Sequence, residues 1–236
     1  DMGTTSVRHN SVSKCFICTA GKYNAHSGSK GCLACNKGRY LSDNSANIDR
    51  HNDENDCDIC PNGQYSDNIG SATCKNSQKG TFLSENDPLA HDSKSDCTIC
   101  PSGQYSSSEA SSNCIKCAVG NYLVETHEFG DHDDEGDCHV CPSGKIAILA
   151  GLSVCENCPP GTYIGDQSTP SAHDDRSDCI VCATGKYTSS RGANSCESCP
   201  PGTYLVISTK VHSIIHVSHM FAIAVKHLCF DNTSTK

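Results

Sequence analysis

Paired cysteines are the residues of this sequence with the most evident chemistry. The stretch from Cys97 to Cys117 holds two C-x2-C pairs with thirteen residues between them. Two such pairs at this distance can hold a zinc ion through four thiolates, or they can form two disulfide bonds. The chain contains 20 cysteines, so the choice decides compartment, fold and class of function together.

The cysteine pairs recur with a nearly constant period. First pairs begin at Cys15, Cys57, Cys97, Cys138 and Cys179, and second pairs begin at Cys32, Cys74, Cys114, Cys155 and Cys196. The interval inside a unit is constant, whereas the connector to the next unit varies in length, so we expect a folded module followed by a surface loop. The predicted division is a connector at 1–14, cysteine-rich repeats at 15–56, 57–96, 97–137, 138–178 and 179–205 (the last partial), and a divergent tail at 206–236.

A glycine and an aromatic residue follow each half of the repeat as Gly-x-aromatic. The pattern occurs ten times, from Gly21 and Tyr23 to Gly202 and Tyr204, and it includes all eight tyrosines. A glycine at a fixed offset predicts a backbone position with φ > 0. The aromatic ring is predicted to cover a neighbouring cross-link and to supply much of a small module's apolar burial. A ligand-binding stripe of tyrosines is less favoured, because small cross-linked modules need their aromatic residues for packing.

The predicted fold class is small disulfide-rich repeats. No segment from residue 15 to 204 shows a convincing apolar period of 3.6 residues, and runs such as 103–106 and 161–164 are typical of brief strands between turns. We expect an elongated tandem array of short β-hairpins and turns, with almost no helix before residue 206.

Three features favour sulfur–sulfur bonds over zinc. Proline follows the second cysteine of a pair at Pro61, Pro101, Pro142, Pro159 and Pro200. Proline lacks the N–H group with which zinc knuckles steady a thiolate. Cysteine above about 8% in a Gly- and Ser-rich chain is typical of cross-linked scaffolds. The formal net charge of −9 argues against nucleic acid, which many small zinc modules bind. An intracellular tandem zinc module that mediates protein contacts is the alternative.

Four cysteines allow three pairings, of which the interleaved one is predicted here. Pairing inside C-x2-C closes a small strained ring, whereas joining first to third and second to fourth ties the two halves with two rungs. The example unit should then contain Cys97–Cys114 and Cys100–Cys117. The predicted disulfide cysteines are Cys15, Cys18, Cys32, Cys35, Cys57, Cys74, Cys97, Cys100, Cys114, Cys117, Cys138, Cys141, Cys155, Cys158, Cys179, Cys182, Cys196 and Cys199.

Two cysteines are predicted to be unpaired thiols. Ser77 occupies the fourth cysteine position of the second unit, and under the interleaved pairing it leaves Cys60 without a partner. Cys229 lies in the tail, outside the repeats. In the same tail, apolar residues at helical spacing make an amphipathic helix the alternative to disorder. Asn232 is the one Asn-x-Ser/Thr glycosylation acceptor.

The repeated motif resembles that of a known family. C-x2-C-P-x-G-x-Y followed by C-x2-C-P-x-G-T-Y, best seen from Cys179 to Tyr204, is similar to the cysteine-rich repeats named after the ephrin receptor tyrosine kinases. These are allied to the cysteine-rich modules of tumour-necrosis-factor and growth-factor receptors. The resemblance covers residues 15–204 and implies an extracellular, disulfide-laddered segment of a secreted or membrane-anchored protein. The sequence shows no kinase segment and no ephrin-binding domain, so kinase activity and ephrin recognition do not carry over.

The connectors between units are acidic and contain a regularly placed histidine. Aspartate directly precedes the first cysteine of a unit at Asp56, Asp96, Asp137 and Asp178, and histidine stands six residues before it at His9, His51, His91, His132 and His173. Calcium or a transition metal at these joints is one reading. The favoured reading is a turn in which aspartate accepts backbone N–H bonds and histidine braces the joint. Neither a metal nor a cofactor is therefore predicted.

The sequence predicts a non-catalytic extracellular segment that acts as a spacer, an adhesion module or a receptor-ectodomain interaction module. Thiol oxidoreductases use one reactive C-x2-C pair at a helix start, not pairs in series, and no separate nucleophile and base stand out. The expected partner is a protein or glycan ligand. Nucleic acid is not expected, and a membrane would be reached only through parts outside this segment.

Overall fold

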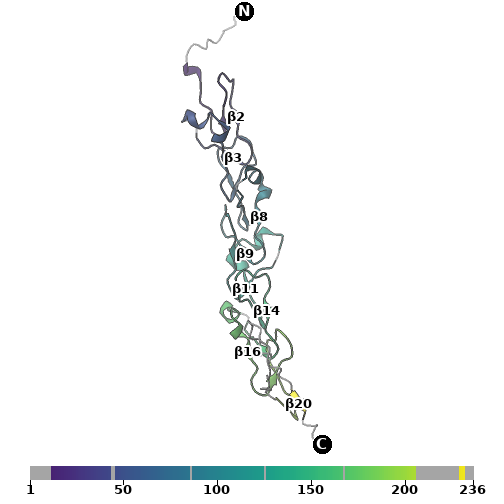
Figure 1. Cartoon of the computed structure of the whole chain (residues 1–236). Coiled ribbons are helices and arrows are strands. Elements are labelled where there is room, and N and C mark those ends of the chain that lie inside the picture. Colours follow the sequence, from purple (N-terminus) through teal and green to yellow (C-terminus); the bar gives the residue numbers. More distant parts are fainter. Residues whose placement is uncertain are drawn as a thin grey trace, which may run out of the picture. The chain divides into compact units, whose positions relative to one another are not determined.

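The computed structural model describes residues 12–43, 46–85, 87–124, 126–166, 168–205 and 229–231. These residues form two-stranded antiparallel sheets and three-residue 3-10 helices, without an α-helix among them (Figure 1). The predicted fold class of small disulfide-rich β-hairpin repeats with almost no helix is confirmed. Such short elements bury little surface, so the turns and cross-links must stabilise them.

Each sheet from β1 to β18 pairs a strand that contains the Gly-x-aromatic residue with a strand just after the next cysteine, whereas β20 begins at the cysteine itself. The paired strands are β1 (Lys22–Tyr23) with β2 (Leu33–Ala34), β3 (Arg39–Tyr40) with β4 (Asp58–Ile59), β5 (Gln64–Tyr65) with β6 (Lys75–Asn76), β7 (Thr81–Phe82) with β8 (Thr98–Ile99), β9 (Gln104–Tyr105) with β10 (Ile115–Lys116), β11 (Asn121–Tyr122) with β12 (His139–Val140), β13 (Lys145–Ile146) with β14 (Glu156–Asn157), β15 (Thr162–Tyr163) with β16 (Ile180–Val181), β17 (Lys186–Tyr187) with β18 (Glu197–Ser198), and β19 (Thr203–Leu205) with β20 (Cys229–Asp231). Every sheet within the described residues therefore consists of two strands that are consecutive in the sequence.

The 3-10 helices lie in the connectors. They are η1 (Val12–Lys14), η2 (Ile48–Arg50), η3 (Glu54–Asp56), η4 (Pro88–Ala90), η5 (Lys94–Asp96), η6 (Phe129–Asp131), η7 (Glu135–Asp137), η8 (Pro170–Ala172) and η9 (Arg176–Asp178). After η1, each described connector carries two of them, one on each side of its histidine.

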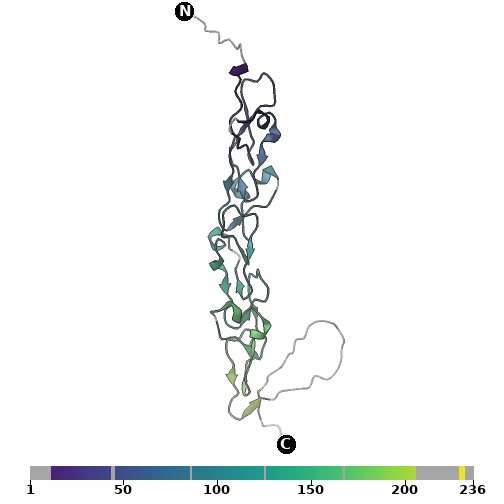
Figure 2. The same cartoon turned by 90° about the vertical axis from the view of Figure 1, so that its left-hand side faces the viewer.

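The chain divides into two compact units. One comprises Asp1–Ile99 with Ser106–Cys114, and the other comprises Cys100–Tyr105 with Ile115–Lys236. The first contains the hairpins from β1 to β8, and the second contains those from β9 to β20 (Figure 2).

The core of each unit consists of small clusters around a cross-link. In the first unit Tyr23 and Leu41 pack against the disulfide partners Cys35 and Cys57. The second unit repeats this arrangement in two clusters, Tyr105–Cys117–Leu123 with Cys138, and Ile146–Cys158–Ile164–Cys179. The predicted covering of a cross-link by the Gly-x-aromatic residue is confirmed in these clusters.

The ten motif glycines all have positive φ, between 75° and 86°, as predicted. Several also lie where no side chain would fit. A Cβ atom on Gly63 would stand 1.9 Å from the carbonyl oxygen of Ala110, and one on Gly21 would stand 2.0 Å from that of Gly70. Both pairs join consecutive repeats of the first unit, so glycine is required there for the repeats to interlock.

Candidate functional site

Disulfide bonds connect consecutive cysteine pairs along the chain, except where Ser77 replaces a cysteine. The second cysteine of one pair bonds to the first cysteine of the following pair, alternately across a short and a long loop. The bonds are Cys18–Cys32, Cys35–Cys57, Cys60–Cys74, Cys117–Cys138, Cys141–Cys155, Cys158–Cys179 and Cys182–Cys196. Cys100, Cys114 and Cys199 are disulfide-bonded as well. These sulfurs are joined to one another and are not available as zinc ligands.

The predicted interleaved pairing is wrong. Cys18 bonds to Cys32 and not to Cys35, and Cys60 bonds to Cys74 and is not an unpaired thiol. The free cysteines of the described residues are Cys15 and Cys97, both of which were expected in disulfides. The reason is the hairpin geometry, because the strand after one pair is antiparallel to the strand after the next cysteine. A bond between the second cysteine of one pair and the first cysteine of the next pair closes the open end of the hairpin that these two strands form.

The long-loop disulfides also cross the predicted repeat boundaries. Cys35–Cys57, Cys117–Cys138 and Cys158–Cys179 each join one predicted repeat to the next. The boundaries themselves stay a prediction. The predictions for the side chain of Cys229, for the segment 206–228, for Asn232 and for His9 lie outside the described residues.

Ser77 leaves Cys97, not Cys60, without a disulfide partner. Its hydroxyl group occupies the place of the missing sulfur and contacts the Sγ atom of Cys97. Ser77 is buried, and Cys97 is only partly exposed. Burial raises the pKa of the Cys97 thiol, and the hydrogen bond with Ser77 opposes this rise to a smaller extent.

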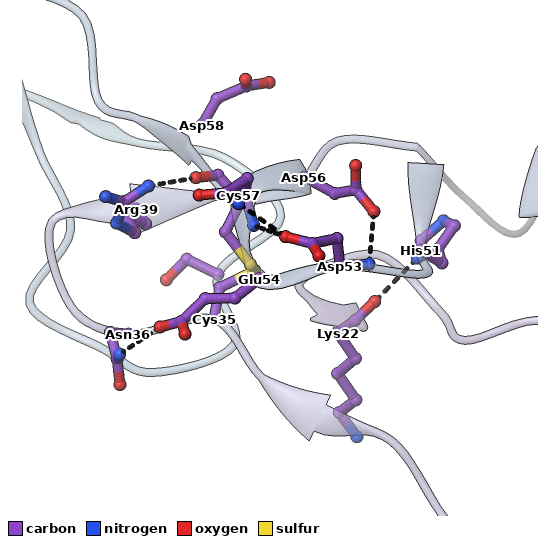
Figure 3. Close-up of a disulfide and its surroundings, with 12 residues drawn as sticks. Lys22, Cys35, Asn36, Arg39, His51, Asp53, Glu54, Asp56, Cys57 and Asp58 are labelled. Carbon is purple, nitrogen blue, oxygen red and sulfur yellow. Dashed lines mark hydrogen bonds between the residues drawn. A yellow bond between two sulfur atoms is a disulfide. The ribbon is translucent and has the colours of Figure 1, made fainter. Parts of the chain in front are cut away.

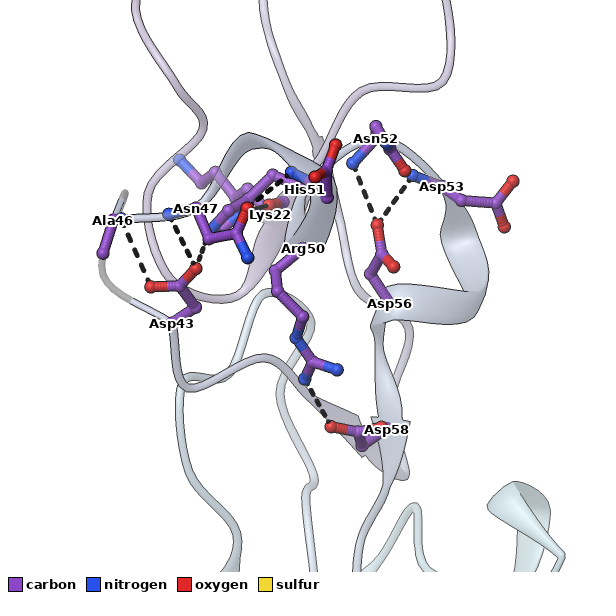
Figure 4. Close-up of polar contacts among 11 residues, drawn as sticks. Lys22, Asp43, Ala46, Asn47, Arg50, His51, Asn52, Asp53, Asp56 and Asp58 are labelled. Atoms are coloured by element: carbon purple, nitrogen blue, oxygen red, sulfur yellow. Dashed lines mark hydrogen bonds and ion pairs between the residues drawn. The ribbon is translucent and has the colours of Figure 1, made fainter.

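Each connector folds around capped 3-10 helices, as the connector of the first repeat illustrates (Figure 4). Asp56 Oδ2 accepts hydrogen bonds from the backbone N–H groups of Asn52 and Asp53, at 2.9 and 2.8 Å. The Asp53 side chain in turn accepts from the backbone N–H group of Asn55 at 2.8 Å. This reciprocal capping box recurs at Ser93/Asp96, Asp134/Asp137 and Asp175/Asp178. The predicted role of the aspartate before each first cysteine as a backbone acceptor is confirmed.

The connector histidine fastens the connector to the preceding hairpin (Figure 3). His51 Nδ1–H donates to the carbonyl oxygen of Lys22 at 2.7 Å, and the backbone N–H group of Asn24 donates to the carbonyl oxygen of His51 at 2.8 Å. Because the partner of Nδ1 is a carbonyl, the proton must reside on this nitrogen. The same ring contact recurs as His91 to Gln64 at 2.5 Å, His132 to Gln104 at 2.8 Å and His173 to Lys145 at 2.6 Å. The predicted bracing role of histidine is confirmed.

These four histidines are almost completely buried, with exposed fractions of 3% for His51 and 0% for the others. The surroundings of their Nε2 atoms differ. That of His91 lies 2.5 Å from the carbonyl oxygen of Glu85, and that of His51 lies 3.6 Å from the carboxylate of Asp43. Those of His132 and His173 have no hydrogen-bond partner among the described residues.

The polar side chains around the first connector contact one another or the backbone. Arg39 donates to the carbonyl oxygen of Cys57 at 2.7 Å, beside the disulfide that closes the first long loop (Figure 3). Arg50 forms an exposed ion pair with Asp58 at 2.9 Å, and this pair raises the pKa of the guanidinium group (Figure 4). In the part of the chain that the structure describes, no three His, Cys, Asp or Glu side chains are grouped to hold a metal ion.

Sequence reasoning missed one recurrent core position. An aliphatic residue follows the aromatic residue in the second half of four repeats, and its exposed fraction is 4% or less. These residues are Leu41, Leu83, Leu123 and Ile164. The signal was present in the sequence, because an aliphatic residue follows the aromatic residue at each of these places. Their backbone groups also join repeats, since Leu41 N–H donates to the carbonyl oxygen of Ser71 in the next repeat at 3.1 Å.

Two segments of the chain match a known protein family. A sequence profile of the family described as tyrosine-protein kinase ephrin type A/B receptor-like matches residues 89–133 and 169–210. No curated protein matches the chain. Both matched segments contain the buried histidine of a connector, the capping box after it and the first cysteine of the following unit, Cys97 or Cys179. Among the described residues, none of the helices has the length and apolar character of a membrane span.

Proposed function

We propose that this chain, which carries ephrin-receptor-like cysteine-rich repeats, is an extracellular spacer that holds the parts on either side of it at a set separation. The family is one of receptor ectodomains, which together with the disulfide bonds points to an extracellular location. Ectodomain modules of this family are typically non-catalytic. A spacer needs stiffness from one repeat to the next, and the contacts between repeats support that property.

The observation that carries the proposal is the interlocking of consecutive repeats. Gly38 N–H donates to the carbonyl oxygen of Ser66 at 2.9 Å, and Leu41 N–H donates to that of Ser71 at 3.1 Å. Both bonds run from the first repeat to the second. The second unit contains the same pair of bonds, from Gly120 to Ala147 and from Leu123 to Leu152. Backbone bonds of this kind, together with the long-loop disulfides, resist bending between neighbouring repeats.

A non-catalytic role also agrees with the state of the reactive side chains. Most cysteines are bonded to each other, and the four connector histidines donate Nδ1–H to backbone carbonyls from buried positions. The bonded sulfurs cannot act as nucleophiles, and the four histidine rings are buried away from a substrate. The contacts of these side chains are those of a scaffold.

Small-angle X-ray scattering of the oxidised chain tests the spacer. A globular chain of 236 residues would have a radius of gyration of about 18 Å. We expect a clearly larger value that is unchanged between low and high salt, because interlocked repeats do not depend on charge. A value near that of a globule, or a broad distance distribution typical of a flexible chain, would contradict the proposal.

A second experiment tests the cross-linked scaffold against the zinc alternative. Addition of a reductant should collapse the protection of backbone amides from exchange, whereas a chelator should leave it unchanged. Loss of protection with the chelator alone would instead support a metal module.

The runner-up function is a surface that contacts a protein or glycan ligand directly. It is favoured by exposed apolar side chains on the first 3-10 helix of three connectors, Ile48, Leu89 and Phe129, with exposed fractions of 65%, 75% and 43%. Replacing all three with serine should leave the scattering curve unchanged. A loss of cell-surface or matrix binding in that variant would favour the ligand-contact role over the spacer.

A further inference from the structure

One long connector of the first unit is closed without a covalent bond. The Cys35 connector, residues 36–43 and 46–56, is closed by Cys35–Cys57. The Ser77 connector, residues 78–85 and 87–96, ends instead at the contact between the Ser77 hydroxyl group and the sulfur of Cys97. In the second unit, Cys117–Cys138 and Cys158–Cys179 close the equivalent connectors.

Only non-covalent contacts hold the Ser77 connector in place. Strand β7 pairs with β8 through Thr81 with Ile99 and Phe82 with Thr98. The His91 ring lies 2.5 Å from the carbonyl oxygens of both Gln64 and Glu85. Each of these contacts can break and re-form without cleavage of a chemical bond.

We propose that the Ser77 connector is the place where the first unit opens first, and that its opening uncovers the Cys97 thiol while every disulfide stays intact. The neighbouring Cys35 connector cannot leave its hairpin to the same extent, because its two ends are covalently joined. Local opening is easiest where the fewest constraints hold the two ends of a loop together. The proposal does not depend on the spacer function, since it concerns the stability of one joint.

The closed connector protects the thiol in two ways. Cys97 is only partly exposed, and burial raises its pKa, so the reactive thiolate is scarce. Opening removes the buried surroundings and restores ordinary thiol reactivity. Denaturant or tension that opens this connector would therefore make the Cys97 thiol reactive.

Alkylation of the oxidised full-length chain under native conditions tests the proposal. Cys15 is the internal reference, because it is free and exposed. With iodoacetamide and peptide mass spectrometry, we expect Cys15 to be labelled rapidly and Cys97 more slowly, with a Cys97 rate that rises in urea well below the unfolding midpoint. Labelling of Cys97 only in step with global unfolding would overturn the proposal.

Hydrogen exchange provides a measurement that needs no variant. The amides of the Ser77 connector should exchange at least about tenfold faster than those of the Cys35 connector, which has the same local architecture in the same unit. Equal exchange in the two connectors would contradict the proposal.

The variant Ser77→Cys supplies the missing bond. It should abolish alkylation of Cys97 and raise protection of the Ser77 connector by roughly 100-fold, with no change at the Cys35 connector. The matched control is Ser77→Ala, which removes the hydroxyl group without adding a cross-link and should leave Cys97 at least as reactive as before. If Ser77→Cys forms the bond and protection does not rise, the connector is not the site of opening.

Discussion

The Cys35 and Ser77 connectors have the same local architecture although only one of them contains a disulfide. Each carries two 3-10 helices, η2 and η3 in the first and η4 and η5 in the second, with a capping box before the following cysteine. Each is fastened by a buried histidine, and each ends in a two-stranded hairpin. The conformation of the connector is therefore dictated by its own turn and capping residues, and the disulfide acts on its stability.

The largest expected effect comes from removing the cross-link of the Cys35 connector. The double variant Cys35→Ser/Cys57→Ser should lower the free energy of unfolding by about 3 kcal/mol, the value for a closed loop of this length. Amide protection of residues 46–56 should fall towards that of the Ser77 connector. The measurement is urea unfolding combined with hydrogen exchange. Altered chemical shifts of the capping-box amides would show that the connector changes conformation. That result would contradict the claim that the disulfide affects the stability of the connector but not its conformation.

The glycine positions test the part of the architecture that local sequence dictates. Gly63 and Gly185 have the same φ of 79°, but only Gly63 faces a backbone atom, the carbonyl oxygen of Ala110. Gly185→Ala should destabilise by about 1–2 kcal/mol, the cost of a left-handed conformation for a residue with a Cβ atom. Gly63→Ala should cost clearly more, because the interlocked carbonyl must also move. Equal thermal unfolding shifts for the two variants would show that the close approach is unimportant.

The motif glycines and the connectors show which features of the fold can be predicted from the sequence. The positive φ of the motif glycines and the capping role of aspartate were predictable, since each is decided by residues within one turn. The role of histidine was predictable from its constant place before the cysteine, although its partner carbonyl lies in the preceding hairpin. The disulfide pairing was not, because treating four cysteines as a closed set hides the fact that Cys35 pairs with Cys57 of the next unit. The Gly-x-aromatic motif follows every C-x2-C pair, so the hairpin and its disulfide repeat at each pair, while short and long loops alternate. Ser77 then deprives Cys97 of a partner.

Acid should weaken the connectors through their capping carboxylates. The Ser177 backbone and hydroxyl groups donate to Asp175 and lower the pKa of its carboxyl group below the ordinary value. A carboxyl group with a folded-state pKa below its unfolded-state pKa contributes stability that is present above the unfolded-state pKa and is lost as the pH falls through the folded-state pKa. Thermal unfolding should therefore shift downward as the pH is lowered below about 4. Asp175→Ser, which copies the residue at position 93, should reduce that shift and keep the cap.

The smallest expected effect concerns a place where one repeat departs from the others. Ala110 has φ of 55° at the position that glycine occupies as Gly70, Gly151 and Gly192 in other repeats. Ala110→Gly relieves the left-handed conformation but gains unfolded-state entropy, so we expect a net stabilisation of no more than about 1 kcal/mol. The converse variant Gly192→Ala should destabilise by more, because its Cβ atom would also meet the Asn157 side chain at 2.7 Å. Chemical unfolding of both variants decides this. If Ala110→Gly is destabilising, the strain of the left-handed conformation at Ala110 is smaller than the entropy that alanine removes from the unfolded chain. The residues of the turn would then determine the conformation of a repeat less strongly than the comparison of the two connectors suggests.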